Sequence, residues 1–193
     1  MKQKLFNLIF INYFTNKWNK IYPKFDKTNY SLFELKVPNS SSFFHGEIIK
    51  WAKDNSNKNS KILFAGENNE IKKVLGFNQN IFTTSLENSD YIWNFEENYP
   101  PSLEEKRFDL IISQAILEHL INPYKHVLDL SRLLNKKGVL ILHTVIPLFP
   151  YHRYPIDCFR FFPDWFEEIA KRFNLKILNK KIKGTHIFYM YQK

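Results

Sequence analysis

The stretch that most restricts the fold of this chain spans residues 108–144. It begins with Phe-Asp-Leu-Ile-Ile-Ser at 108–113, reaches Leu-Glu-His at 117–119, and continues to Gly138 and the apolar run at 139–144. This order is typical of a strand, a polar turn, a helix that has begun by Leu-Glu-His, a glycine stop and a second strand. That unit repeats in parallel α/β sheets.

A further apolar run, Lys-Ile-Leu-Phe-Ala at 61–65, is stopped by Gly66. The runs at 61–65, 108–113 and 139–144 lack strict alternation, as expected of strands that are buried on both faces. We predict that these three lie side by side as central parallel strands. Around them the sequence predicts helices at 45–53, 70–75 and 163–173, and strands at 80–86, 91–93, 175–182 and 186–191.

The motifs Phe-Asp-Leu-Ile, Leu-Glu-His and Arg-x-Leu-x-x-x-Gly, the last at 132–138, resemble class I S-adenosylmethionine-dependent methyltransferases of the type 11 kind. The resemblance covers residues 44–193. It implies an α/β fold with a Rossmann-like, mostly parallel sheet that ends in an antiparallel C-terminal hairpin. It also implies S-adenosylmethionine as the cofactor and no metal. Residues 1–43 are predicted to form an N-terminal helical cap and connector.

Family members carry a Gly-x-Gly-x-Gly turn after the first strand, where this chain has Gly66-Glu67-Asn68-Asn69-Glu70. Only Gly66 matches, so the glycine-rich motif is degenerate. The resemblance implies that Gly66, Glu67 and Asn68 contact the cofactor, with Asn68 making the turn in a left-handed backbone conformation. Glu67 or Glu70 could supply the carboxylate that the motif lacks. The alternative is an ordinary loop with polar side chains in solvent.

The same resemblance assigns cofactor contacts to the residues that follow the next strands. Glu87 would bind the ribose hydroxyls, because a carboxylate accepts two hydrogen bonds from a diol. Asn94 would reach the adenine amino group, and Phe95 would pack against adenine. Ser113 and Gln114 would line the methyl end of the pocket. For Glu87 the alternative is a solvated loop residue.

Residues 144–161 resemble the Pro-Phe-x-Tyr-x-x-His-x-x-Pro-x-Asp-Tyr-x-Arg-Phe loop of a subgroup associated with sugar and surface-polysaccharide pathways. Either His152 or His143 could take a proton from the acceptor, since histidine titrates near neutrality. Asp157 would orient that histidine. The alternative for Asp157 is a salt bridge with Arg160 that fixes the loop.

Composition narrows the remaining classes of protein. The single cysteine, Cys158, excludes an internal disulfide and a cysteine zinc site, and it indicates a cytoplasmic location. The net charge of +9 comes from scattered lysines, so no nucleic-acid partner is expected. Apolar residues at helical spacing between Leu5 and Tyr13 predict an amphipathic helix that either packs on the domain or lies on a membrane surface.

We therefore predict methyl transfer from S-adenosylmethionine to an oxygen or nitrogen of a small or saccharide-like acceptor. Arg153 and Arg160 suit an anionic acceptor, because guanidinium groups bind phosphate and carboxylate bidentately. One alternative is a catalytically inactive methyltransferase-like module that binds a partner. Another is a basic protein of the membrane surface that uses the N-terminal helix. The acceptor, the methylated atom and the oligomeric state stay open.

Overall fold

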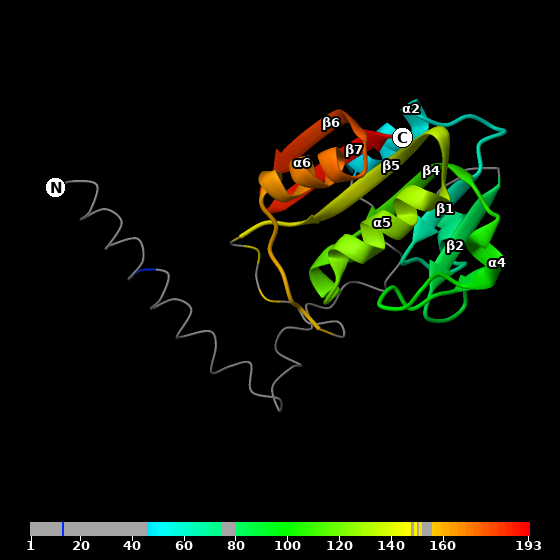
Figure 1. Cartoon of the computed structure of the whole chain (residues 1–193), viewed down its shortest axis with the longest axis horizontal. Coiled ribbons are helices and arrows are strands. Elements are labelled where there is room, and N and C mark those ends of the chain that lie inside the picture. Colours follow the sequence, from blue (N-terminus) through cyan, green and yellow to red (C-terminus); the bar gives the residue numbers. More distant parts are fainter. Residues whose placement is uncertain (1–12, 14–45, 75–79, 148, 150, 152–155) are drawn as a thin grey trace. The chain divides into compact units, whose positions relative to one another are not determined.

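The computed structural model describes residues 13, 46–74, 80–147, 149, 151 and 156–193. The chain divides into two compact units, Met1–Val37 and Pro38–Lys193, and the elements described below belong to the second (Figure 1). The predicted N-terminal helix and the predicted boundary at residue 43 lie outside the described residues.

The described unit alternates strands with helices along the chain. Its helices are α2 (Gly46–Asp54), α3 (Ile71–Val74), α4 (Pro101–Glu104), the 3-10 helix η3 (Leu117–His119), α5 (Pro123–Leu133) and α6 (Pro163–Arg172). Its strands are β1 (Ile62–Ala65), β2 (Ile81–Ser85), β3 (Tyr91–Ile92), β4 (Phe108–Gln114), β5 (Leu134–Val145), β6 (Lys176–Lys183) and β7 (His186–Gln192).

The strands form one seven-stranded sheet in the order β3-β2-β1-β4-β5-β7-β6. β1 pairs in parallel with β2 and β4, and β4 pairs in parallel with β5. All four residues of β1 are buried, as are most residues of β4 and β5, because helices cover both faces of the centre of the sheet. The predicted set of three central parallel strands is confirmed, and with it the predicted Rossmann-like, mostly parallel sheet.

Two apolar layers hold the sheet between its helices. The larger layer packs α4, α5 and α6 on one face, with Leu103, Leu130 and Phe166 among its fully buried residues. The other face packs on α2 through Ile48 and Trp51. Figure 1 shows α5 and α6 in front of the sheet, with α2 on the opposite side. The loops that follow the strands therefore emerge from the edges of a three-layer core.

The C-terminal hairpin is antiparallel, as predicted: β7 pairs with β5 on one side and with β6 on the other. Gly184, with a φ of +60°, makes the turn between β6 and β7. β6 forms one edge of the sheet, and its last five residues are exposed, with lysines at 180, 181 and 183. At the other edge, β3 has only two residues.

The structure corrects the prediction for the segment between β4 and β5. Leu-Glu-His forms η3, and the true helix α5 begins at Pro123 after Asn122, whose side chain accepts a hydrogen bond from the backbone N–H of Lys125. Gly138 does not stop a helix either, because it lies within β5. A Cβ atom at Gly138 would stand 3.0 Å from the backbone oxygen of Phe108, so glycine permits close approach of β4.

Candidate cofactor and acceptor site

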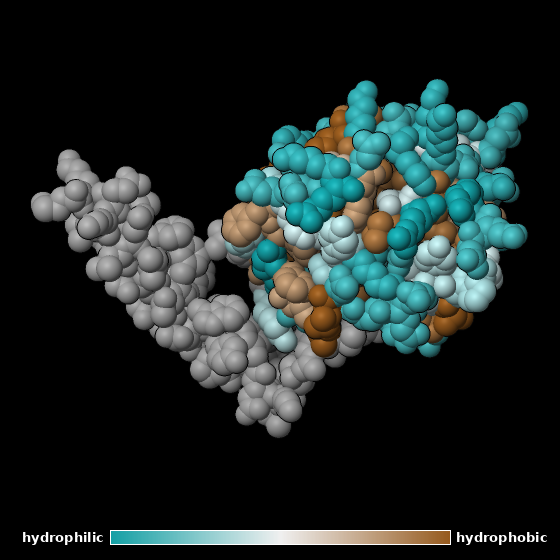
Figure 2. Space-filling model, in the orientation of Figure 1, coloured by the Kyte–Doolittle hydropathy of each residue, from teal (hydrophilic) through white to brown (hydrophobic). Residues whose placement is uncertain are grey.

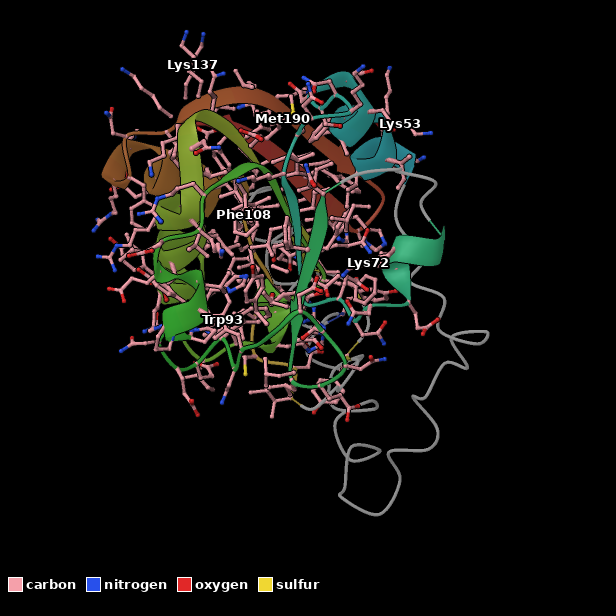
Figure 3. The ribbon with its side chains drawn as sticks, turned by 90° about the vertical axis from the view of Figure 1, so that its right-hand side faces the viewer. Lys53, Lys72, Trp93, Phe108, Lys137 and Met190 are labelled. Carbon is pink, nitrogen blue, oxygen red and sulfur yellow. The ribbon has the colours of Figure 1, made fainter. Side chains whose placement is uncertain are left out.

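The central strands end together at one edge of the sheet, where Ala65 of β1 pairs with Ser113 of β4. In open α/β sheets, the loops at this carboxyl edge form the binding crevice. Figure 3 shows Trp93 at this end of the molecule and Lys53 and Lys137 at the opposite end. The residues predicted to bind the cofactor follow β1, β2 and β3 or end β4, so they all belong to this edge.

Gly66 makes the turn that the sequence assigned to it. Its φ is +90°, and its N–H donates to the carbonyl of Thr84 at 2.8 Å. A Cβ atom at this position would stand 2.2 Å from Cδ1 of Ile116 and 3.8 Å from the Phe95 ring. Only glycine fits, because both the backbone conformation and the neighbouring Ile116 side chain exclude a larger residue.

The residues after Gly66 form the turn that leads into α3. The Asn68 side-chain oxygen accepts a hydrogen bond from the N–H of Glu70 at 2.9 Å. The left-handed conformation predicted for Asn68 is wrong, since the described non-glycine residues with positive φ are Asn88, Ala115, Lys137 and Asn174. The Asx turn, in which an asparagine side chain caps nearby backbone, explains why asparagine stands here. Glu67 is half-buried, and its predicted contact with the cofactor stays a prediction.

The loop after β2 carries Glu87 with its side chain exposed. This loop is tied to the loop after β1, because the N–H of Asn69 donates to the carbonyl of Asn88 at 2.8 Å. The neighbouring acid Asp90 is engaged within the protein, since it accepts from the backbone N–H of Thr83 at 2.8 Å and from Lys72 at 2.7 Å. Glu87 is thus the carboxylate of this loop that can meet a ligand.

Asn94 and Phe95 follow β3 and are both engaged by the protein. The Asn94 side-chain oxygen accepts from the N–H of Glu96 at 3.2 Å, and its amide donates to the Glu97 carboxylate at 3.1 Å. Phe95 is 8% exposed, and its ring centroid lies 4.4 Å from that of His126. Phe95 therefore packs mainly in the core beneath Gly66, and contact of either side chain with adenine stays a prediction.

Ser113 and Gln114 end β4, and the two side chains differ in exposure. Ser113 is fully buried, with its hydroxyl 3.0 Å from Nε2 of His126, whereas Gln114 is half-buried. Burial lowers the pKa of His126 to about 3, with a smaller contribution from Lys125, so this imidazole is neutral. Sequence reasoning missed His126, although it lies on the apolar face of α5 with Leu130 and Leu133 at helical spacing.

The loop between β5 and α6 is fixed by an ion pair. Both terminal nitrogens of Arg160 bind the two carboxylate oxygens of Asp157, whose side chain is 1% exposed, and Arg160 Nε donates to the carbonyl of Phe149 at 3.3 Å. Asp157 thus forms the salt bridge with Arg160 that the alternative interpretation predicted. His152 and Arg153 lie outside the described residues, so their roles stay predictions.

Leu-Glu-His anchors this loop to the sheet. The backbone oxygen of Glu118 accepts from the N–H groups of Cys158 and Phe159 at 2.7 and 3.2 Å. The buried Glu118 carboxylate accepts from the hydroxyl of Thr144 on β5 at 2.6 Å, and Nδ1 of His119 lies 2.5 Å from the carbonyl of Ile156. The motif therefore joins η3, β5 and the loop after β5.

His143 lies near the end of β5, buried to 2% exposure. Its Nε2 is 3.0 Å from Nδ1 of His186, the first residue of β7. The sequence singled out His143 as a candidate base but gave no role to His186. The pairing of β5 with β7 could have been inferred from the predicted hairpin, but the register that makes the two imidazoles meet could not.

Exposed apolar side chains gather at the carboxyl edge. Leu86 and Ile92 lie beside Glu87, and Ile121 and Phe159 lie near η3, with exposed fractions from 41% to 66%. In contrast, Figure 2 shows a mainly hydrophilic surface over the face that carries α5 and α6. Apolar surface next to a carboxylate suits a ligand with a polar sugar and an apolar ring.

A polar cavity of about 370 Å³ opens at the opposite, amino edge of the sheet. Its lining includes Asn57, Asn59 and Lys137, far from the loops described above, and we do not assign the cofactor to it. Within the described residues, no group of three or more histidine, cysteine or acidic side chains could hold a metal ion. The helices of the described part are too short and too polar to cross a membrane.

Residues 79–142 match the family described as "Methyltransferase domain". The match begins just before β2 and ends in β5, so it includes Glu87, Asn94, Ser113 and Leu-Glu-His. No curated protein sequence matches the chain.

Solved structures share the fold over most of the chain. A SAM-dependent methyltransferase from Aquifex aeolicus is 14% identical, with a TM-score of 0.58 over 88% of this chain and 99% of that one. Magnesium protoporphyrin IX methyltransferase from Synechocystis PCC 6803, with bound SAH, is 12% identical, with a TM-score of 0.57 over 76% and 80%. The cyclase SpnF is 9% identical, with a TM-score of 0.59 over 76% and 80%. At these identities the likeness shows the fold.

Proposed function

We propose that this protein is an S-adenosylmethionine-dependent methyltransferase. The observation that carries the proposal is the hydrogen bond between Asn69 and Asn88, which holds the Glu87 loop beside the Gly66 turn. An exposed carboxylate beside this turn fits the ribose part of the cofactor, whose hydroxyls can donate to it. The match of residues 79–142 to a methyltransferase domain supports the same class of reaction.

We further propose that the acceptor is a small or saccharide-like molecule methylated on oxygen or nitrogen. The support is the resemblance of the loop after β5 to that of sugar-modifying relatives, and its position at the carboxyl edge next to β5. Because Asp157 occupies the terminal nitrogens of Arg160, recognition of an anionic acceptor depends chiefly on Arg153. A cytoplasmic location is part of this proposal. Such a reaction needs alignment of the acceptor with the methyl group and exclusion of water.

The second candidate is a methyltransferase-like module without methyl transfer. The side chain of Ile116 closes over Gly66, and Asn68, whose side chain binds the N–H of Glu70, stands where family members have a second glycine. The fold itself does not settle the matter, because the structurally similar SpnF is a cyclase.

Calorimetric titration with S-adenosylmethionine and S-adenosylhomocysteine separates the two candidates. We expect both ligands to bind, and we expect Glu87→Ala to weaken binding by about 1.5 to 3 kcal/mol, the range for a hydrogen bond to a charged group. Glu105→Ala, which removes an exposed acid before β4 at the opposite edge, is the matched control and should bind like the parent protein.

The outcomes of this titration are distinct. A folded parent protein that binds neither ligand would favour the inactive module. Binding that is equally strong in the Glu87 variant would keep the methyltransferase proposal and remove Glu87 from the site.

A further inference from the structure

His143 and His186 form a pair of imidazoles with a fixed mutual orientation. Their ring centroids lie 5.2 Å apart with an interplanar angle of 26°, and Nε2 of His143 is 3.0 Å from Nδ1 of His186. The Phe188 ring stacks on His143 at 4.6 Å, and the Phe149 ring packs edge-on against His186 at 5.2 Å. Aromatic contacts on both sides therefore hold the two rings in hydrogen-bonding geometry.

The pair lies at the acceptor end of the proposed site. His143 is level with Gln114, and Ala65 is level with Ser113, so His143 stands two strands away from the Gly66 turn. Two strand spacings correspond to about 10 Å. His186 pairs with Val145, which places it further toward the carboxyl edge than His143. The pair and the Glu87 loop thus lie on opposite sides of β1 and β4.

The short distance between the rings shows that they share a hydrogen bond. One nitrogen must donate and the other must accept, so one hydrogen lies between them. If Nδ1 of His186 donates to His143, the other ring nitrogen of His186, Nε2, has no proton and can accept one. Uptake of two protons would place two cations next to each other, with His143 almost completely buried.

Of the charged groups around the pair, Arg160 is bound by Asp157 and Glu47 by Lys181, whereas Lys183 adds a positive charge. Lys183 of β6 lies opposite His186 in the register, and the Arg160 guanidinium lies over the Phe149 ring at 5.8 Å. Glu47 of α2 is engaged by Lys181. Gln114 of β4 and Phe188 of β7 carry no charge. Lys183 therefore adds to the cost of placing two positive charges on the pair.

We propose that His186 is the general base for the acceptor and that His143 is its positioning partner, an inference that rests on the proposed methyltransferase function. The acceptor O–H or N–H gives its proton to Nε2 of His186 while the acceptor lone pair forms a bond to the methyl carbon. The bond between sulfur and methyl breaks, and its electron pair stays on sulfur. The new imidazolium keeps its Nδ1–H hydrogen bond to neutral His143, and the proton then passes to solvent.

Acylation by diethyl pyrocarbonate tests the pair without knowledge of the acceptor, because the reagent attacks unprotonated imidazole nitrogen. We would measure the rate at each histidine of the full chain between pH 5 and 8, by mass spectrometry of its peptides. His143→Gln keeps a side-chain oxygen that can accept from His186, whereas His143→Leu removes the acceptor. We expect His186 to react, and its pH midpoint to shift downward in the leucine variant but hardly in the glutamine variant.

Titration with S-adenosylhomocysteine in each variant separates this inference from the proposed function. Equal binding in all variants with the expected shift supports the inference. An unchanged His186 midpoint in the leucine variant overturns it, as does acylation of His143 in place of His186. Should His143→Leu fail to fold, His186→Gln decides: loss of all acylation at the pair supports the assignment, and persistent acylation at His143 overturns it. Absence of ligand binding in the parent protein defeats the proposed function alone.

Discussion

At Gly66, the backbone conformation and a neighbouring side chain both exclude a Cβ atom. The φ of +90° is unfavourable for other residues, and Cδ1 of Ile116 lies 2.2 Å from the Cβ position. Backbone strain alone costs about 1 to 3 kcal/mol, and we expect Gly66→Ala to lower the free energy of unfolding by more than this because the new Cβ atom also collides with Ile116. Urea denaturation measures this loss.

Gly184→Ala is the matched control for that prediction. Gly184 also has a positive φ, at +60°, but a Cβ atom there would meet open space. The control should therefore show the strain without the collision. Adding Ile116→Ala should recover part of the stability lost in Gly66→Ala. Equal losses at the two glycines would mean that Ile116 yields freely, and that the turn is more open than its contacts indicate.

The position of a residue could be predicted from the sequence where a motif fixes it. It could not be predicted where contacts between distant parts of the chain determine it. Glu87 and Gly66 follow strands that the apolar pattern reveals, so both stand at the predicted edge. The pairing of Ser113 with His126 joins side chains 13 positions apart on different elements, and that of His143 with His186 joins side chains 43 apart. Neither contact has a local sequence signal.

At the scale of single elements, α5 and α6 begin differently. The Asn122 side chain caps α5 by accepting from the N–H of Lys125 at 3.1 Å, whereas the N-cap of α6, Phe162, provides no such bond and is 63% exposed. We expect Asn122→Ala to destabilise the protein by about 1 kcal/mol, and Phe162→Ser to stabilise it by a similar amount. Thermal and urea unfolding of both variants measure whether each change lowers or raises the free energy of unfolding. Changes of the same sign would show that capping does not control these helices.

The predicted and observed elements agree best where apolar runs are long. Strands at 61–65 and 108–113 were readable because burial on both faces demands continuous apolar sequence. Between β4 and β5 the helix start was misplaced, although Asn122 before Pro123 is a helix-start signal, because Leu-Glu-His has the spacing of a helix. The four-residue α4 was missed, since one turn of helix has no periodicity to detect.

At the scale of the whole molecule, stability should depend on pH through His126. Its pKa is about 3 in the folded protein, against 6.5 for an ordinary histidine. Below pH 6.5 the His126 side chain binds a proton in the unfolded chain, whereas in the folded protein it stays unprotonated until the pH falls to about 3. The free energy of unfolding should therefore fall as the pH is lowered across this window, by up to about 1.4 kcal/mol per pH unit.

Comparison with His126→Gln isolates this contribution from that of the carboxylates, which titrate in the same range. Urea unfolding at several pH values between 7 and 4 should give a steeper decline in the parent protein than in the variant. Parallel curves for the two proteins would mean that His126 accepts a proton in the folded state.

The two edges of the sheet also influence how copies of the chain behave toward one another. An exposed strand edge can pair with a strand of another molecule, which leads to aggregation. β3 offers only two residues for such pairing, and β6 would bring its lysines against those of a second copy. Electrostatic repulsion and the short edge together disfavour intermolecular β-pairing, so the described unit should stay dispersed even at high protein concentration.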